Sequence, residues 1–201
     1  MRYFEYGEKE INYLKSKDKL LGQAIDRIGF VKRKVIPDLF AGLIYNIVGQ
    51  QISMKAADTI WNRIEKRFGA VTPGVIRTVT VEELQSTGVS MRKAEYIKKI
   101  ADAILDGSFS IEELWHLEDE EVRKRLTSLP GVGQWTAEML MIFSMQRKNI
   151  LSWNDLGIRR GIMLLYNHTK LDKELFEKYR LRYSPYGTIA SFYLWEISLG
   201  R

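Results

Sequence analysis

The chain has 201 residues, of which 45% are hydrophobic and 28% charged, and its formal net charge is +6. This length and composition are typical of a globular protein with one large or two small domains, and the absence of cysteine excludes disulfides, iron-sulfur clusters and thiolate metal sites. The two histidines, His116 and His168, lack the spacing of metal ligands, so we expect neither a metal nor another cofactor.

Charges occur in the first ten residues, MRYFEYGEKE, where a secretory signal needs an apolar stretch, so we expect the protein in the cytoplasm. The longest apolar stretches, such as 139–143, are far shorter than a bilayer span, and we expect a monomer without membrane contact. The basic balance, with a sequence pI near 9.4, favours an anionic partner.

Hydrophobic periodicity predicts an all-α fold, because nearly every segment repeats with the period of a helix. Asp18, Ser53 and Ser90 each precede an amphipathic segment, as N-cap residues do. Capping boxes at 80–83 and 110–113 indicate further helix starts. Glycines that would end three of the helices follow at Gly29, Gly69 and Gly107. The remaining helices are expected at 38–50, 73–78, 81–87, 119–128, 134–147, 156–167, 172–182 and 186–198.

A turn rich in glycine and proline, Leu129 to Gly133, lies between two of the predicted helices. Pro130 stops the first helix, while Gly131 and Gly133 allow positive φ and leave backbone amides uncovered. These amides and the start of the next helix form a donor site for a phosphate, as in a helix-hairpin-helix element that grips a DNA backbone. On this turn alone, a tight connection between packed helices is an equal alternative.

Asp155 stands at the head of a predicted helix, about twenty residues after the turn. One interpretation is a helix N-cap, for which aspartate is a common choice. The other is a catalytic carboxylate held rigidly at a helix start, and Asp155 can serve as both.

The sequence LPGVGQWTA, followed by an aspartate twenty residues after its tryptophan, resembles the helix-hairpin-helix DNA glycosylase superfamily. The branch it resembles most is 3-methyladenine DNA glycosylase II, the alkylation-repair enzymes. Three other stretches match the family in the correct order, and the resemblance runs from about residue 35 to the end. They are 47–53 (IVGQQIS), 88–94 (GVSMRKA) and 184–195, from SPYG to YLW.

The resemblance implies a two-lobed helical fold in which residues 36–150 form one lobe and residues 1–35 and 151–201 form the other. Double-stranded DNA with alkylated bases would cross the cleft between the lobes. Longer members carry an extra N-terminal β domain, and in this chain Tyr3, Phe4 and Tyr6 are candidates for the wall of the base pocket that it leaves open.

By the same resemblance, Asp155 is the catalytic residue of a base-excision enzyme that flips a damaged purine out of the duplex. The base pocket would contain Trp135, Met139 and Trp195, and a cationic purine gains a cation–π interaction on the faces of the two tryptophans. Trp61 and Trp115, on amphipathic segments, are interpreted as core residues. The DNA-binding candidates are Gln51, which would fill the gap left by the flipped base, and Ser53, Gly131, Gly133, Thr136 and Arg159. Gln50 is interpreted as a hydrogen-bonding spacer.

Position 135 decides the reaction class, because bifunctional relatives place their Schiff-base lysine there and this chain has Trp135. We therefore expect a monofunctional hydrolase without lyase activity. Two alternatives remain, a helix-hairpin-helix protein that binds DNA without catalysis and a helical protein-interaction domain. Asn154 keeps the first alternative open, because many relatives carry a second aspartate at that position.

Overall fold

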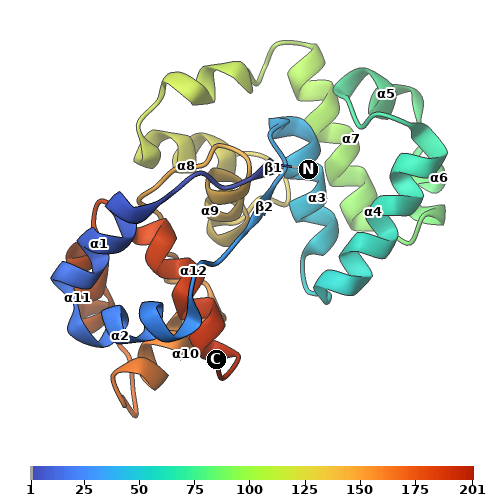
Figure 1. Cartoon of the computed structure of the whole chain (residues 1–201). Helices are drawn as coiled ribbons and strands as arrows, with labels where there is room; N and C mark the ends of the chain where they lie inside the picture. The colour runs from blue at the N-terminus through green and yellow to red at the C-terminus, as the bar shows by residue number, and fades with distance from the viewer. Residues whose placement is uncertain (1) are drawn as a thin grey trace. The chain divides into compact units, whose positions relative to one another are not determined.

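The computed structural model describes residues 2–201 and consists almost entirely of helices (Figure 1). By its internal contacts the chain divides into two compact units, which we call unit 1, Met1–Val35 and Met141–Arg201, and unit 2, Ile36–Leu140. The all-α prediction is confirmed. Among the described residues, no helix has the length and apolar character needed to cross a bilayer, and no three metal-ligating side chains come together.

The helices of unit 2 pack around the buried side chains of α3 (Leu39–Gly49) and α7 (Met91–Leu105), among them Leu43, Ile44 and Ile97. Thr80 and Glu83 form the predicted capping box at the start of α6. The elements are α3 (Leu39–Gly49), α4 (Met54–Phe68), α5 (Pro73–Thr78), α6 (Val81–Ser86), α7 (Met91–Leu105), the 3-10 helix η1 (Glu112–His116), α8 (Asp119–Thr127) and the first part of α9 (Gln134–Phe143).

Unit 1 joins both ends of the chain around α12, whose side chains are almost all buried. Helix α10 lies against α12 at Gly161, where an added Cβ would be 2.2 Å from the carbonyl oxygen of Leu194. Only a glycine allows this approach of the two backbones. The elements are β1 (Arg2–Tyr3), α1 (Glu8–Lys17), α2 (Lys19–Ile28), β2 (Lys34–Val35), α10 (Leu156–Leu165), α11 (Lys173–Tyr183) and α12 (Gly187–Ser198).

The helix boundaries follow the predicted signals closely. Asp18, Ser53 and Ser90 cap α2, α4 and α7 through their side chains. The three predicted terminal glycines have positive φ, at Gly29, Gly69 and Gly107. Each of α2 to α12 overlaps a predicted helix, so capping and periodicity located these elements correctly.

Three features differ from the prediction. Helix α1 was not predicted, because its buried face includes the charged Glu10, which forms an ion pair with Lys148 at 2.7 Å. Helix α9 ends at Phe143 instead of 147, since Gln146 has a φ of +53° and breaks the helical repeat. The capping residues at 110–113 start only a 3-10 helix. The short antiparallel pair β1–β2 is a further addition.

Residues 141–150, which the sequence interpretation grouped with the central lobe, cluster with unit 1. Hydrogen bonds to the start of α12 hold this segment there. Thr188 donates to the carbonyl of Arg147, accepts from the backbone of Ile150, and donates through its own backbone to Lys148.

The interpretation of Trp115 as a core residue is wrong, because its side chain is 47% exposed. It lies in the 3-10 helix η1, whose tighter winding replaces the amphipathic repeat assumed for an α-helix. Trp61 lies half-buried against Tyr45, with the rings edge to face at 5.5 Å.

Candidate functional site

The predicted hairpin connects α8 to α9 in unit 2. Gly131 has a φ of +76°, and a Cβ added there would lie 2.2 Å from the ring of Tyr96. Gly131 is therefore required both for its backbone conformation and for the close approach of this ring. The turn is closed by the backbone of Val132, which donates to the carbonyl of Leu129 at 3.2 Å.

Gly133 does not adopt the positive φ that the sequence analysis allowed for it. Its φ is not in the left-handed region, and a Cβ there would meet no atom within 4 Å. The glycine therefore leaves open space at the start of α9, which begins at Gln134, and the first backbone N–H groups of a helix are suited to binding a phosphate. A side chain would occupy that space without disturbing the fold.

Gln50 ties the end of α3 to the hairpin. Its Nε2 donates to the carbonyl of Gly131 and to the hydroxyl of Thr136, both at 2.9 Å. The prediction of Gln50 as a hydrogen-bonding spacer is confirmed. Thr136 is only 3% exposed, so its hydroxyl serves this internal contact and is not presented at the surface as a DNA-binding side chain.

The loop after α3 carries Gln51, which is exposed and has a φ of +59°. Ser53 ends this loop, and its hydroxyl accepts from the backbone of Ala56 as the N-cap of α4. Lys93 holds the start of this loop in place, since its Nζ donates to the carbonyls of Val48 and Gln50 at 3.0 and 2.7 Å. Burial lowers the pKa of Lys93.

Sequence reasoning did not assign Lys93 a role, although it lies in the stretch 88–94 that resembles the family. Nothing in the spacing of this stretch says that the lysine bonds to backbone carbonyls 43 and 45 residues away. Gln51, Ser53 and the hairpin glycines are thus joined in unit 2 through Gln50 and Lys93.

Two of the predicted pocket residues, Trp135 and Met139, lie on the unit 2 part of α9. Trp135 is half-buried and Met139 is 3% exposed. The third, Trp195, lies on α12 in unit 1. A common base pocket of these residues stays a prediction.

Asp155 lies in unit 1 as the N-cap of α10 and is 8% exposed. Its Oδ1 accepts from the backbone of Ile158 at 2.9 Å and from the indole Nε1 of Trp195 at 3.0 Å. The cap interpretation is therefore confirmed. A carboxylate held by two donors has a fixed orientation, as a catalytic charge requires.

The indole reaches Asp155 because position 157 is a glycine. A Cβ on Gly157 would lie 2.9 Å from Cδ1 of Trp195 and 3.2 Å from Oδ1 of Asp155. Sequence reasoning placed Trp195 in the base pocket and missed both this hydrogen bond and Gly157. The sequence contains a signal, the glycine two residues after Asp155. However, Trp195, which donates the hydrogen bond to Asp155, lies 40 residues further along the chain than the aspartate.

Arg159 lies one turn along α10 from Asp155, and its guanidinium covers the ring of Trp153 at 4.9 Å from the centroid. The edge of Trp153 packs on Phe176 at 5.2 Å. This cation–π contact holds the arginine in one place. Contact of Arg159 with DNA stays a prediction.

Among the candidate wall residues at the N-terminus, Phe4 is 4% exposed and packs edge to face on Phe192 at 5.0 Å. The hydroxyl of Tyr6 donates to the carbonyl of Val31 at 2.6 Å. Tyr3 is 43% exposed. Phe4 and Tyr6 are thus part of the packing of unit 1.

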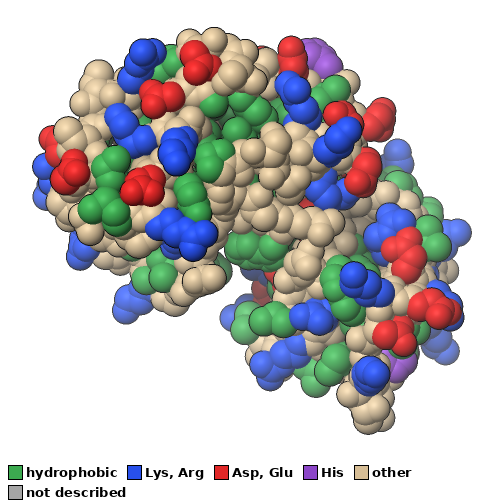
Figure 2. Space-filling model, turned by 180° about the vertical axis from the view of Figure 1, so that it is seen from behind, with side chains coloured by type: hydrophobic (Ala, Val, Ile, Leu, Met, Phe, Trp, Pro, Cys, Tyr) green, Lys and Arg blue, Asp and Glu red, His purple; other side chains and the backbone are tan. Residues whose placement is uncertain are grey.

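Lys and Arg side chains are interspersed with Asp and Glu side chains on the surface of each unit in the view of Figure 2. On this face the excess of basic residues is spread out and does not form one continuous patch.

Comparisons with known proteins agree with these features. The family model described as HhH-GPD superfamily base excision DNA repair protein matches residues 44–185. A DNA-3-methyladenine glycosylase of Schizosaccharomyces pombe is 37% identical over 161 residues, which are 78% of this chain and 71% of that protein.

Two solved structures are similar over almost the whole chain. One is a DNA-3-methyladenine glycosidase from Bacillus halodurans, with a TM-score of 0.85 and 37% identity over 98% of this chain and 93% of that one. The other is a 3-methyladenine DNA glycosylase of Schizosaccharomyces pombe in complex with abasic DNA, with a TM-score of 0.83 and 32% identity over 94% and 95%. The chain belongs to the HhH-GPD superfamily of base excision DNA repair proteins and is a DNA glycosylase.

Proposed function

We propose that the chain flips alkylated purines out of duplex DNA and hydrolyses their N-glycosidic bond, with Asp155 as the catalytic carboxylate. Cleavage of this bond places positive charge on the deoxyribose. A carboxylate about 4 Å away, at an effective dielectric constant of about 20, offers about 4 kcal/mol of stabilisation. At about 1.4 kcal/mol per tenfold, this approaches a thousandfold in rate.

The observation that carries the proposal is the fixed and buried carboxylate of Asp155. The backbone of Ile158 and the indole of Trp195 both donate to its Oδ1, which leaves its orientation little freedom. A carboxylate in this state contributes its charge without first having to reorganise. It can also orient or deprotonate the attacking water.

Alkylated purines are the substrate class that such a site can serve. A purine methylated on a ring nitrogen is already cationic and departs without a general acid, so one aspartate suffices for its release. The names of the relatives, which are 3-methyladenine glycosylases, support the same class.

We also infer that the reaction stops at base release, without a lyase step. A lyase of this superfamily needs an amine where this chain has Trp135, and no lysine occurs from 134 to 147. The next lysine, Lys148, forms an ion pair with Glu10 at 2.7 Å.

The test is incubation of the protein with a panel of duplexes that carry single modified bases, followed by mass spectrometry of the released bases. We expect free 3-methyladenine or 7-methylguanine and an unbroken strand that is cut only after alkali. Borohydride should trap no covalent adduct. Binding of the duplexes without release of any base would contradict the proposal and favour a protein that binds DNA without catalysis.

A further inference from the structure

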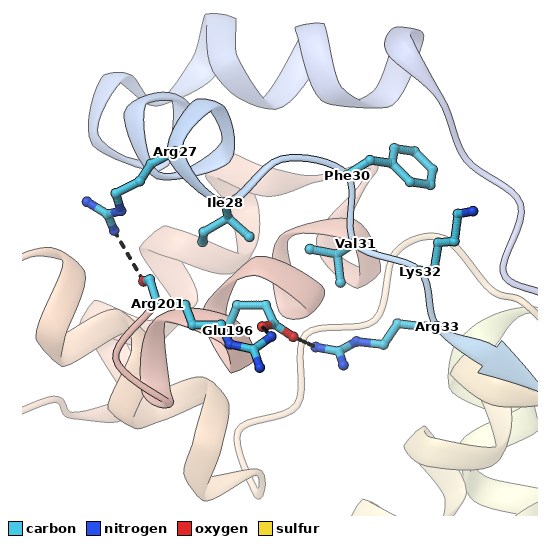
Figure 3. Close-up of a pocket in the computed structure, with 8 residues that line it drawn as sticks. All are labelled: Arg27, Ile28, Phe30, Val31, Lys32, Arg33, Glu196 and Arg201. Atoms are coloured by element: carbon cyan, nitrogen blue, oxygen red, sulfur yellow. Dashed lines mark hydrogen bonds and ion pairs between the residues drawn. The ribbon is translucent and has the colours of Figure 1, made fainter.

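A pocket of about 550 Å³ in unit 1 lies between the segment after α2 and the end of α12 (Figure 3). Cations predominate in its lining, which also contains one buried glutamate. In Figure 3 the side chain of Arg33 points toward Glu196, which follows Trp195 directly in the sequence. The lining residues are Arg27, Ile28, Phe30, Val31, Lys32, Arg33, Glu196 and Arg201.

Arg33 connects this pocket to the Asp155 site. Its Nη2 donates to Oε1 of Glu196 at 2.7 Å, and its guanidinium carbon lies 5.6 Å from the centroid of the Trp195 ring. The indole of Trp195 in turn donates to Asp155 at 3.0 Å. Arg33 and Asp155 therefore contact the same indole, and charges that face one buried ring interact at a low effective dielectric constant.

Trp195 is fixed by its neighbours on α9 and α12 as well as by Arg33. The rings of Phe143 and Phe192 stack beside it at centroid distances of 5.8 and 6.0 Å. Its surroundings are thus already occupied by two aromatic rings and one cation. The indole serves to hold Asp155, besides any contact that it makes with a base.

The charge of Arg33 poses a problem for the reaction, because a cation next to the site opposes the positive charge that develops on the sugar. Glu196 removes this problem. Its side chain is 7% exposed and carries the compensating charge at hydrogen-bond distance from Arg33. Its second oxygen accepts from Arg201, whose side chain is 70% exposed, so water screens that charge strongly.

We propose that Arg33 and Glu196 are positioning residues that form a charge-balanced clamp on Trp195, holding its indole N–H on Asp155 without adding net charge beside the reacting sugar. This inference rests on the proposed role of Asp155. The clamp joins the segment before β2 to the end of α12, 163 residues apart.

The test is the single-turnover rate of 7-methylguanine release at saturating protein. Glu196→Gln keeps an acceptor for Arg33 but leaves its positive charge uncompensated, so we expect the rate to fall on the order of tenfold. The double variant Arg33→Gln with Glu196→Gln removes the excess charge together with the clamp, so we expect a rate above that of Glu196→Gln but still below that of the wild type. Binding to a duplex with a stable abasic-site analogue should change little in either variant.

Glu10→Gln is the matched control, because Glu10 is another buried glutamate of unit 1 that forms an ion pair, with Lys148. It should lower the melting temperature as Glu196→Gln does but leave the rate unchanged. A double variant as fast as the wild type would overturn the clamp on Trp195, and a double variant slower than Glu196→Gln would overturn the charge balance. An unchanged rate in folded Glu196→Gln would overturn both. If the wild type releases no base, the proposed function itself fails, and this outcome differs from every result for the clamp.

Discussion

In unit 2 the hairpin is shaped by its own glycines and tied by the side chain of Gln50, whereas in unit 1 the carboxylate of Asp155 is held by the first turn of its own helix and by the indole of Trp195. Gly131 supplies the left-handed turn of the hairpin, and its neighbour Gly133 keeps the start of α9 open. Asp155 depends instead on Trp195, which lies 40 residues away. The hairpin should therefore be most sensitive to change at its glycines and less so at Gln50, while the Asp155 site should be sensitive at every residue that orients the indole.

The comparison predicts two separable classes of variant. Changes at the hairpin should weaken binding to all duplexes and leave the rate of the bound complex nearly intact. Changes around Asp155 should slow base release by the bound complex and leave binding to duplexes nearly intact. Binding titrations and single-turnover release at saturating protein measure these two quantities independently.

The largest effect is expected for Asp155→Asn. Asparagine caps helices about as well as aspartate, and its Oδ1 can accept from Ile158 and Trp195 in the same way, so the fold should persist. The lost charge should slow base release on the order of a thousandfold. Single-turnover release, a melting curve and a binding titration together measure this.

Asp172→Asn is the control for Asp155→Asn, since Asp172 caps α11 of the same unit through the backbone of Leu175. It should leave release unchanged. Near-normal release by folded Asp155→Asn would mean that the carboxylate is only a cap, and the catalytic assignment would have to be abandoned.

Local chemistry explains why so much of the fold could be predicted. A cap such as Ser53 and a terminal glycine such as Gly69 act within one turn of their own helix, so the sequence alone contains the signal. Helix α1 was not predicted, because its buried Glu10 is neutralised by Lys148, 138 residues away. In the sequence alone, a buried charged residue cannot be distinguished from a solvent-exposed one.

The same distinction applies to the candidate site. The hairpin could be predicted because Pro130 and the two glycines are adjacent in sequence. The partners of Asp155 could not, because an indole hydrogen bond made possible by Gly157 requires α10 and α12 to be packed together first. The prediction of Thr136 as a DNA-binding residue likewise had no sign in the sequence that Gln50 would donate a hydrogen bond to its hydroxyl.

The second largest effect is expected for Gly131→Ala. Its Cβ would collide with the ring of Tyr96, and its φ of +76° disfavours any side chain. Overpacking typically costs about 1–3 kcal/mol, and the left-handed conformation adds about 1–2 kcal/mol. We expect a lower melting temperature and a loss of duplex affinity of about a hundredfold if the turn rearranges.

Gly133→Ala is the matched variant, because its Cβ would enter open space. Its melting temperature should stay that of the wild type, while affinity for damaged and undamaged duplexes falls to a similar extent. Wild-type affinity of Gly133→Ala for undamaged DNA would show that no phosphate lies over this glycine.

A smaller effect is expected for Gln50→Leu, which leaves the carbonyl of Gly131 and the hydroxyl of Thr136 without their donor. An unsatisfied buried group costs about 1–3 kcal/mol, so duplex affinity should fall on the order of tenfold. Because Gln51 follows Gln50 directly in the sequence, we expect it to shift when Gln50 loses its hydrogen bonds, so release from a well-paired lesion should slow more than release from a lesion opposite a gap. Equal slowing on both substrates would show that Gln50 acts on the hairpin alone and has no effect on Gln51.

The smallest effect concerns the charges that hold unit 1 together, and it depends on pH. Burial raises the pKa of Asp18, but hydrogen bonds from Leu21, Tyr166 and Arg182 more than offset this and keep the pKa below its ordinary value. A carboxylate with a lowered pKa contributes stability that is present above about pH 4 and is lost as the pH falls through its folded-state value. Asp18→Asn should therefore destabilise the protein by about 1–3 kcal/mol at pH 7, because it weakens hydrogen bonds to a charged group.

As the pH falls below about 4, the unfolded chain takes up a proton at Asp18 before the folded protein does, so the stability difference between Asp18→Asn and the wild type should shrink. Urea unfolding at pH 7, 5 and 3 measures this difference directly. The control is again Asp172→Asn, which changes an exposed N-cap of the same unit without an ion pair to Arg182. A difference for Asp18→Asn that stays constant from pH 7 to pH 3 would mean that the capping hydrogen bond stabilises unit 1 here and the ion pair with Arg182 does not.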